Sequence, residues 1–299
     1  MQEDDIAAIA AGIAVLSGFT GRAERLGGLT NRVYRLGEHI LRVPGSGTEE
    51  YIDRAREAAM ADAAAQAGVA PRLIWADPAR GLMVTEFVEG VTLTPALFAS
   101  RPGAPGRAAQ ALGRLHRSGA EFPFRFELFA MIDDYLRLLA GKEVELPAGY
   151  HDVVAEAGAV RAALAARPVA PVACHCDPLC ENFIDDGTRV RIVDWEYAGM
   201  NDPMWDLGDL SVEAQFGPGQ EEEMLTAYFG AEARPADRGR MVIYKAMCDL
   251  LWTLWGLIQL ANANPADDFA AYAAGRFARC RALMGTPDFA RHLAAVARG

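Results

Sequence analysis

The stretch "CHCDPLCENFI", residues 174–184, decides how the whole chain is interpreted. It holds three of the five cysteines and one of the five histidines, so a metal-binding knot is the first hypothesis to test. Zinc sites are usually built from separated ligand pairs that let the chain wrap around a tetrahedral ion. The cysteines at 174, 176 and 180 lack that spacing, and adjacent side chains point apart. We therefore interpret them as small buried residues of a reduced protein.

Without its cysteines, the stretch has the pattern HxDxxxxN, formed by His175, Asp177 and Asn182, and Asp194 follows in "VRIVDWEYAG". Kinases use an Asp to accept the proton of the substrate hydroxyl, an Asn five positions later to hold magnesium, and a further Asp at a strand end for the same metal. Single Asp and Asn residues also favour turns. The joint spacing favours phosphoryl transfer. Because Asp177 fills the role of base, His175 is expected to brace the loop by hydrogen bonding.

Composition limits the kinds of partner that the chain can bind. Forty acidic against 29 basic residues give a net charge of -11, and no basic stripe with interleaved aromatics occurs. This argues against nucleic acid and suits a cationic ligand. A hydrophobic share of 52% predicts a folded protein with a real core. No run approaches the roughly 20 apolar residues of a membrane span, so we expect no span and a cytoplasmic location.

The first 90 residues have the pattern of a small sheet. Short β-rich runs near 22–28, 32–37 and 39–43 are broken by Gly and Asn, and two more surround the "DPARG" turn. Between them, "TEEYIDRAREAAMADAAAQAG" has helical spacing after a Thr cap and ends at Gly68. The pattern predicts a five-stranded sheet with one helix, and a boundary near Glu89 and Gly90.

Beyond that boundary the chain is mainly helical. The predicted helices are 106–119, 149–166, 220–230, 237–261 and 266–284. A β-rich island at about 171–194 interrupts them. We therefore predict an α+β protein with an N-terminal nucleotide-binding lobe, residues 1–90, and a larger helical lobe, residues 91–299, which carries the catalytic loop and the substrate pocket.

Several blocks of the chain resemble the choline/ethanolamine kinase family, within the wider group of aminoglycoside-phosphotransferase-like enzymes. They are "GGLTNRVYRL", "HCDPLCENFI", "IVDWEYAGMNDPMWDLGDLSVE" and "LLWTLWGLIQ". The whole group shares the HxDxxxxN element, whereas the block from WEYAG to WDLGDLSVE and the tryptophan pair are more specific. The resemblance implies a protein-kinase-like fold, with ATP and Mg as cofactors and Asn182 and Asp194 as the metal ligands.

The resemblance also suggests which residues face the nucleotide phosphates. The "GGLTN" turn, which alone would fit an ordinary hairpin better, would cover the ATP phosphates with Gly28, Thr30 and Asn31 nearest. A protein kinase uses a strand lysine paired with a helix glutamate at this place. No lysine precedes residue 142, and Arg42 in "ILRVPG" takes the position, with Glu57 as its expected partner. The alternative is an ordinary surface ion pair.

Two further segments are expected to hold the site together. The resemblance implies that "TEFVEG" connects the lobes and that its backbone at Glu86, Phe87 and Val88 meets the adenine. Trp205 and Asp206 are expected to fasten the catalytic segment to the helical lobe, which is a structural role.

Two aromatic pairs suggest the substrate. Trp252 and Trp255 lie three apart on a predicted helix, as do Phe269 and Tyr272 on the next. Such spacing usually indicates core packing, but two pairs on adjacent helices also suit a box for a quaternary ammonium group. The resemblance favours the box. Glu213 would attract the cation, or else bridge helices.

Together these patterns predict ATP- and Mg-dependent phosphorylation of the hydroxyl of choline, with ethanolamine as a second acceptor. One alternative keeps the fold and takes an aminoglycoside or another small amino alcohol. Another is a nucleotide-binding protein without catalysis, and a third is a zinc-stabilised interaction protein built on "CHCDPLC".

Overall fold

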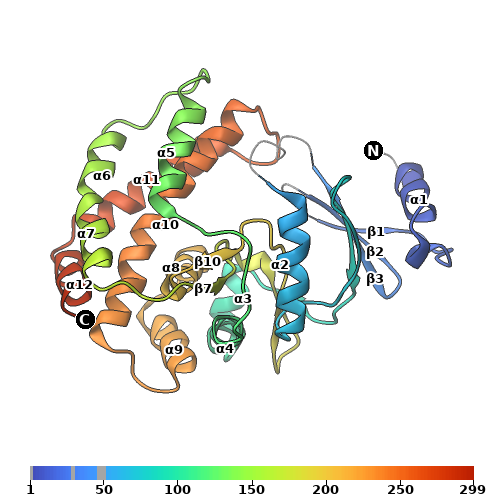
Figure 1. Cartoon of the computed structure of the whole chain (residues 1–299), viewed down its shortest axis with the longest axis horizontal. Coiled ribbons are helices and arrows are strands. Elements are labelled where there is room, and N and C mark those ends of the chain that lie inside the picture. Colours follow the sequence, from blue (N-terminus) through green and yellow to red (C-terminus); the bar gives the residue numbers. More distant parts are fainter. Residues whose placement is uncertain (1–2, 28–30, 46–51) are drawn as a thin grey trace.

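The structure of the protein, a computed structural model, describes residues 3–27, 31–45 and 52–299. The predicted phosphate-covering residues Gly28 and Thr30 therefore lie outside the described residues. A small part built around one sheet lies beside a larger, mainly helical part (Figure 1). The predicted α+β arrangement of a small β-rich part and a larger helical part is confirmed.

The small part contains a five-stranded antiparallel sheet with the order β1-β2-β3-β5-β4. Its strands are β1 (Glu24–Gly27), β2 (Asn31–Leu36), β3 (His39–Pro44), β4 (Leu73–Asp77) and β5 (Leu82–Glu86). The five predicted strands are thus all present. Side chains alternate between the two faces of each strand, and in β5 Leu82 and Val84 face one core while Met83 faces the other.

A helix covers each face of this sheet. Helix α2 (Arg54–Gln66) lies between the sheet and the large part, and α1 (Glu3–Ala11) lies on the far side (Figure 1). The sequence pattern predicts only one helix in this part, and that prediction is wrong because α1 is a second one. The apolar residues of α1 cover the outer face of the sheet together with a following 3-10 turn, Ala14–Leu16. The buried residues of that helix, of the turn and of the link between them are Ile6, Ala10, Ile13 and Leu16.

Helix α2 begins later than its composition predicts. Asp53 is the N-cap, and its carboxylate accepts hydrogen bonds from the amides of Ala55 and Arg56 at 3.0 and 3.1 Å. The predicted cap, Thr48, lies outside the described residues. An Asp side chain at this position satisfies amide groups that have no partner within the helix, so the first turn starts at Arg54.

The large part begins where the chain leaves the first sheet after Glu86. Strand β6 (Val91–Thr92) pairs with β8 (Phe183–Asp185), which pairs with β9 (Val190–Ile192). Strand β7 (Val172–Cys174) pairs with β10 (Gly199–Asn201). The predicted β-rich island is therefore present as parts of two small sheets. We keep 1–90 and 91–299 as the proposed lobes.

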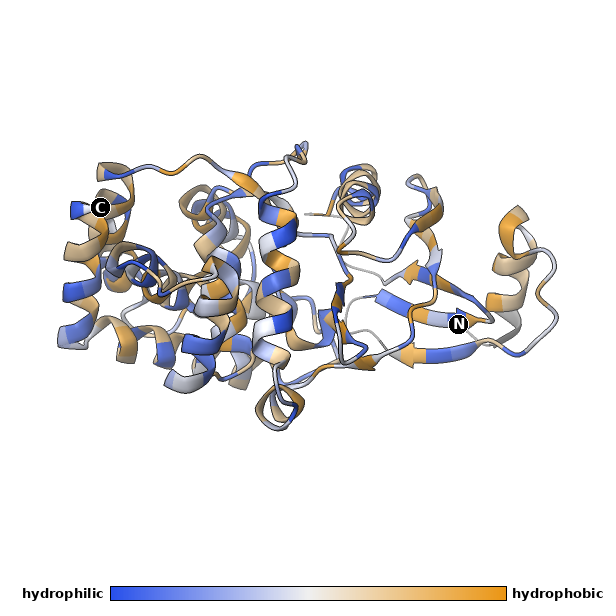
Figure 2. Ribbon diagram, turned by 90° about the horizontal axis from the view of Figure 1, so that it is seen from below, coloured by the Kyte–Doolittle hydropathy of each residue, from blue (hydrophilic) through white to orange (hydrophobic). Residues whose placement is uncertain are grey.

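Ten helices of the described chain build the rest of this part, and in Figure 2 they carry both hydrophobic and hydrophilic positions. They are α3 (Pro95–Ser100), α4 (Ala104–His116), α5 (Leu128–Leu139), α6 (Tyr150–Glu156), α7 (Gly158–Ala166), α8 (Pro203–Glu213), α9 (Pro218–Phe229), α10 (Pro235–Ala261), α11 (Phe269–Met284) and α12 (Pro287–Arg298). The single helix predicted over 149–166 is two helices, α6 and α7, with a break at Ala157.

Helix α10 is the centre of the large part. Among the described residues it is the one helix long and apolar enough, by length and composition, to cross a membrane. This corrects the expectation that no segment has that character. However, 83% of its most apolar stretch is buried inside the protein, where it packs against α5, α8, α11 and α12. Its apolar composition therefore reflects its place as the core helix.

Candidate active site

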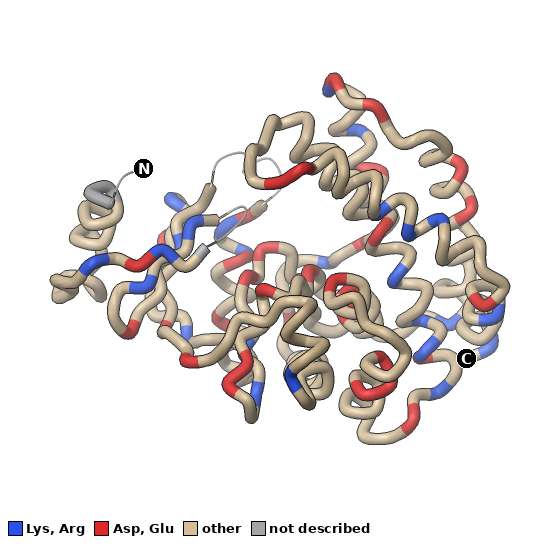
Figure 3. The backbone as a smooth tube through the Cα atoms, turned by 180° about the vertical axis from the view of Figure 1, so that it is seen from behind, with Lys and Arg blue, Asp and Glu red and all other residues tan. Residues whose placement is uncertain are grey.

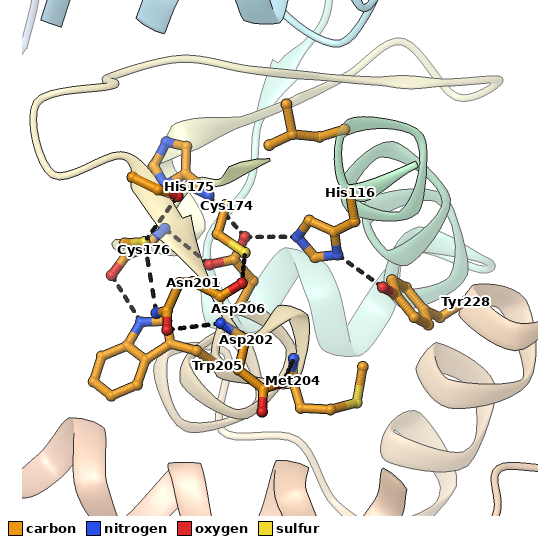
Figure 4. Close-up of polar contacts among 12 residues, drawn as sticks. His116, Cys174, His175, Cys176, Asn201, Asp202, Met204, Trp205, Asp206 and Tyr228 are labelled. Carbon is orange, nitrogen blue, oxygen red and sulfur yellow. Dashed lines mark hydrogen bonds and ion pairs between the residues drawn. The ribbon is translucent and has the colours of Figure 1, made fainter. Parts of the chain in front are cut away.

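The catalytic loop predicted from the sequence follows β7 and is fastened to helix α8 (Figure 4). The two carboxylate oxygens of Asp206 accept hydrogen bonds from the amides of His175 and Cys176, both at 2.8 Å. The indole nitrogen of Trp205 donates to the carbonyl of Cys176 at 2.9 Å. Cys176 adopts a left-handed backbone conformation, φ 66°, which these contacts hold in place. The predicted fastening role of Trp205 and Asp206 is confirmed.

A histidine without a predicted role completes this network. His116, on α4, contacts Asp206 through Nε2 at 2.9 Å and the hydroxyl of Tyr228 through Nδ1 at 2.9 Å (Figure 4). Asp206 is fully buried, and the protein itself supplies a hydrogen-bond partner to each of its carboxylate oxygens. The nearby thiol of Cys174 has its pKa raised well above the usual value by burial, then by the charge of Asp206. Among the described residues, Cys174, His116 and Asp206 form a group whose ligand atoms lie within 4.8 Å of one another. Cys176 and Cys180 are not part of this group, and His116 and Asp206 already bond to each other, so the cysteines of "CHCDPLC" are not gathered as the zinc-knot alternative requires.

His175 has the geometry of a brace. Its ring is fully buried and its Nε2 donates to the carbonyl of Val193 at 2.9 Å. The edge of the ring packs against Trp195, with centroids 4.7 Å apart. Burial lowers the pKa of His175, which keeps the ring neutral near pH 7. We infer that it positions the loop relative to the segment after β9 and does not exchange protons with a substrate.

Asp177 presents a free carboxylate. Its backbone carbonyl accepts hydrogen bonds from the amide of Leu179 at 2.8 Å and from Nδ2 of Asn182 at 3.0 Å. Its half-buried carboxylate has no hydrogen-bond partner among the described residues. Burial raises the pKa of Asp177 well above its usual value, and the charges of Asp209 and Glu213 raise it further. The raised pKa makes Asp177 a stronger base than an exposed aspartate.

The two segments that carry the predicted metal ligands Asn182 and Asp194 are hydrogen-bonded to each other, since the backbone amide of Val193 donates to the backbone carbonyl of Asn182 at 2.9 Å. Asp194 follows with a left-handed backbone, φ 67°, and its buried Oδ1 has no partner. Carboxylate oxygens of Glu57, Asp194 and Glu196 lie within 4.8 Å of one another, where acidic positions gather in the middle of the molecule (Figure 3).

This donor set fits magnesium. Burial raises the pKa of Asp194, and the charges of Glu196 and Glu57 raise it further, so the carboxylates repel one another unless a cation separates them. The side-chain nitrogen Nδ2 of Asn182 donates to the carbonyl of Asp177. The side-chain oxygen Oδ1 of Asn182 is the atom that could bind a metal. Magnesium prefers hard oxygen ligands of this kind, and Asn182 with Asp194 would hold it.

The predicted ion pair of the small part is present. Arg42 contacts Oε1 of Glu57 at 2.5 Å and Oδ1 of Asn31 at 3.0 Å. The side-chain amide of Asn31 donates a hydrogen bond to the carboxylate of Glu196 at 3.1 Å. Arg54, which the sequence pattern does not single out, joins Glu57 and Glu196 at 2.9 and 3.1 Å. Two guanidinium groups thus lie beside the acidic cluster and offset part of its charge.

The backbone of the segment between the two parts is partly engaged. The amide of Glu86 donates to the carbonyl of Arg72 at 3.0 Å, and that of Phe87 donates to Glu38 at 2.8 Å. Within the described chain, the amide of Val88 has no such partner. Of the three residues predicted to meet the adenine, Val88 therefore offers a free donor.

Three of the four predicted aromatic residues lie together. Trp255 meets Phe269 and Tyr272 edge to face, with ring centroids 5.6 Å apart in each case. Trp252 instead meets Tyr197, with centroids 5.3 Å apart. Tyr197 is missing from the sequence prediction, although it lies three residues after Asp194 in "DWEYAG". Trp255 and Tyr272 are half-buried and the other rings are buried.

Glu213 is not a free charge. It forms an ion pair with Arg276 of α11, whose guanidinium also contacts Asp249 at 3.2 Å. The same guanidinium lies over the ring of Tyr272, 4.6 Å from its centroid. The sequence pattern does not indicate Arg276. A cavity of about 670 Å³ between α8 and α11 is lined in part by Glu213, Tyr272 and Arg276.

Comparison with known proteins gives consistent results. The model of the family described as "Phosphotransferase enzyme family" matches residues 22–244. A crystal structure of a choline/ethanolamine kinase family protein from Mesorhizobium loti is 65% identical, with a TM-score of 0.94 and full coverage of both chains. The structure of the choline kinase LicA from Streptococcus pneumoniae is 26% identical over 97% of this chain and 99% of its own, with a TM-score of 0.79. Protein LicA of Haemophilus influenzae is 26% identical over 82% of this chain and 75% of its own length.

Proposed function

The chain belongs to the phosphotransferase enzyme family and, within it, to the choline/ethanolamine kinase family, and we propose that it transfers the γ-phosphoryl group of ATP to the hydroxyl of choline, with ethanolamine as a second acceptor. Membership makes it a small-molecule kinase with a nucleotide-binding fold. One observation carries the proposal: α8 joins the two halves of the site, because its Asp206 bonds the amides of His175 and Cys176 directly before Asp177, and its Asp209 accepts a hydrogen bond from Trp252, a predicted pocket residue of α10.

On the nucleotide side, the residues around Asp194 supply charge. Arg42, held by Glu57 and Asn31, would contact the phosphates, and the amide of Val88 would meet the adenine. Magnesium, when bound by Asn182 and Asp194, supplies neutralisation of the phosphate charge. Positioning and electrostatics account for most of the catalysis in this reaction class.

On the acceptor side, Asp177 orients the hydroxyl. The hydroxyl oxygen forms a bond to the γ-phosphorus while the bond from that phosphorus to the β-γ bridging oxygen breaks. The hydroxyl proton passes to the Asp177 carboxylate, and ADP leaves with the electron pair of the broken bond.

The aromatic residues support choline as acceptor. Trp255 and Tyr272 are the half-buried rings and offer ring surface, which attracts a quaternary ammonium group, and Trp252 lies one turn before Trp255 on α10. The S. pneumoniae relative is a choline kinase by name. An aminoglycoside carries several ammonium groups and would favour a pocket rich in unpaired acids. Here Arg276 offsets Glu213, which disfavours that alternative.

The proposal is tested by magnesium-dependent ADP release from ATP, with choline, ethanolamine, an aminoglycoside or no acceptor added. We expect choline to stimulate release most and ethanolamine to follow. Asp177→Ala should abolish the stimulation while nucleotide binding survives. Stimulation by the aminoglycoside alone, or turnover retained in Asp177→Ala, would contradict the proposal.

A further inference from the structure

One buried carboxylate beside the catalytic loop has an oxygen without a partner. Asp209, on α8, is fully buried. Its Oδ2 accepts a hydrogen bond from the indole nitrogen of Trp252 at 3.1 Å, whereas its Oδ1 has no hydrogen-bond partner. A buried carboxylate oxygen without a partner is costly, so such an oxygen points to a ligand that would complete it.

The position of Asp209 relates it to the acceptor. It is bonded to Trp252, a ring of the proposed ammonium pocket. Asp206, one turn before Asp209 on α8, bonds the amide of Cys176, which directly precedes the catalytic Asp177, and the charge of Asp209 raises the pKa of Asp177. Ethanolamine and choline carry nitrogen and hydroxyl only two carbons apart. A hydroxyl at Asp177 therefore leaves the nitrogen near Asp209.

Of the three carboxylates Asp209, Glu213 and Asp249, Glu213 and Asp249 form ion pairs with arginines. Arg276 pairs with Glu213 and with Asp249, and Arg279 pairs with Asp249 at 2.6 Å. Two guanidinium groups thus face three carboxylates, and Asp209 is the one without an ion pair among the residues described. Glu213, the acid predicted from the sequence to attract the cation, has its charge offset instead.

We propose that Asp209 binds the ammonium group of the acceptor and is the residue that admits ethanolamine beside choline. The assignment rests on the proposed function. A primary ammonium group donates N–H bonds to Oδ1 and adds opposite charge, and such bonds are stronger than neutral ones. The quaternary group of choline has no N–H, so it gains only charge attraction from Asp209 and depends more on the aromatic rings.

The test compares acceptors in wild type and Asp209→Asn, which keeps the shape and removes the charge. We expect the KM for ethanolamine to rise at least about 10-fold more than that for choline, since a hydrogen bond to a charged group is worth that much. The kcat with choline should change less than about 3-fold. The control is the double variant Glu213→Gln with Arg276→Gln, which removes a balanced pair and should change both KM values by a similar factor.

A second measurement is independent of turnover. Methylammonium and tetramethylammonium have no hydroxyl, and their binding can be followed by tryptophan fluorescence. Asp209→Asn should weaken methylammonium binding more than tetramethylammonium binding. If wild type phosphorylates none of the amino alcohols, the proposed function fails, and the two ions still test Asp209. An ethanolamine-to-choline KM ratio or an ion-binding ratio unchanged by the substitution overturns the assignment, as does absence of methylammonium binding to wild type.

Discussion

Two aspartates one turn apart on helix α8 are equally buried and differ in their hydrogen bonds. Asp206 accepts from two backbone amides and contacts His116, so the protein satisfies both of its oxygens. The Oδ2 of Asp209 accepts a hydrogen bond from Trp252, whereas its Oδ1 has no hydrogen-bond partner among the described residues. Burial alone therefore does not identify a functional acid. A fully bonded carboxylate holds the fold, whereas an incompletely bonded one is available to a ligand.

The largest effect is expected where the bonding is complete. Asp206→Ala would leave the amides of His175 and Cys176 buried without acceptors, and we expect it to lower the free energy of unfolding by about 3–5 kcal/mol. Urea denaturation measures this. Asp209→Asn is the matched control and should change stability by less than about 1 kcal/mol. Equal losses in the two variants would remove the distinction between the two aspartates.

Asp194 tests whether the distinction holds outside α8. Like Asp209, it has a buried oxygen without a partner, and it lies close to the carboxylates of Glu57 and Glu196. Asp194→Asn should lower kcat by about 10³-fold or more, because a metal ligand is lost. Its raised pKa means that the ionised carboxylate is less favourable in the folded state than in the unfolded one.

Without metal, the same substitution should therefore leave stability unchanged or increase it by about 1 kcal/mol. Urea denaturation in the presence of a chelator measures this effect. A stability loss as large as that of Asp206→Ala would show that Asp194 holds the fold.

The sequence predicts the parts of the site that depend on local spacing. Asp177, Asn182 and Asp194 lie within one β-rich segment, so their spacing alone brings them together. The pair of Arg42 and Glu57 could be predicted because Arg42 lies on a strand and Glu57 lies on the helix that follows it in the chain. The cap of α2 was misplaced because Asp53 and Thr48 both have side chains suited to capping, and composition alone does not choose between them.

The rest depends on contacts between distant segments. Arg54 and Glu196 are 142 residues apart, and Arg276 and Glu213 are 63 residues apart. No local pattern encodes such pairs. Asp209 had a weaker signal, since it lies three residues after Asp206 and four before Glu213 and so shares a helix face with them. Its missing hydrogen bond, however, is visible only in the folded structure.

A smaller effect is expected from the arginine on the nucleotide side. Arg42→Ala removes a charge held by Glu57 and Asn31, and we expect the KM for ATP to rise about 10-fold, with the acceptor KM little changed. Arg54 still contacts Glu57, so that glutamate is not left unpaired. Steady-state kinetics with ATP varied measures the effect, and unchanged ATP kinetics would exclude Arg42 from the site.

The smallest effect is expected from the hydrogen bond that orients Asp209. Trp252→Phe keeps an aromatic ring but removes the N–H group that donates to Oδ2 of Asp209. The carboxylate is then no longer held in one orientation by this hydrogen bond. We expect the acceptor KM to rise about 3- to 10-fold and stability to fall by about 1 kcal/mol. Trp255→Phe is the matched control, since it loses the same ring volume while its buried indole nitrogen has no partner among the described residues. Only Trp252→Phe loses a hydrogen bond to Asp209. If both variants raise the acceptor KM equally, the area of the aromatic rings, and not the orientation of Asp209, therefore governs acceptor binding.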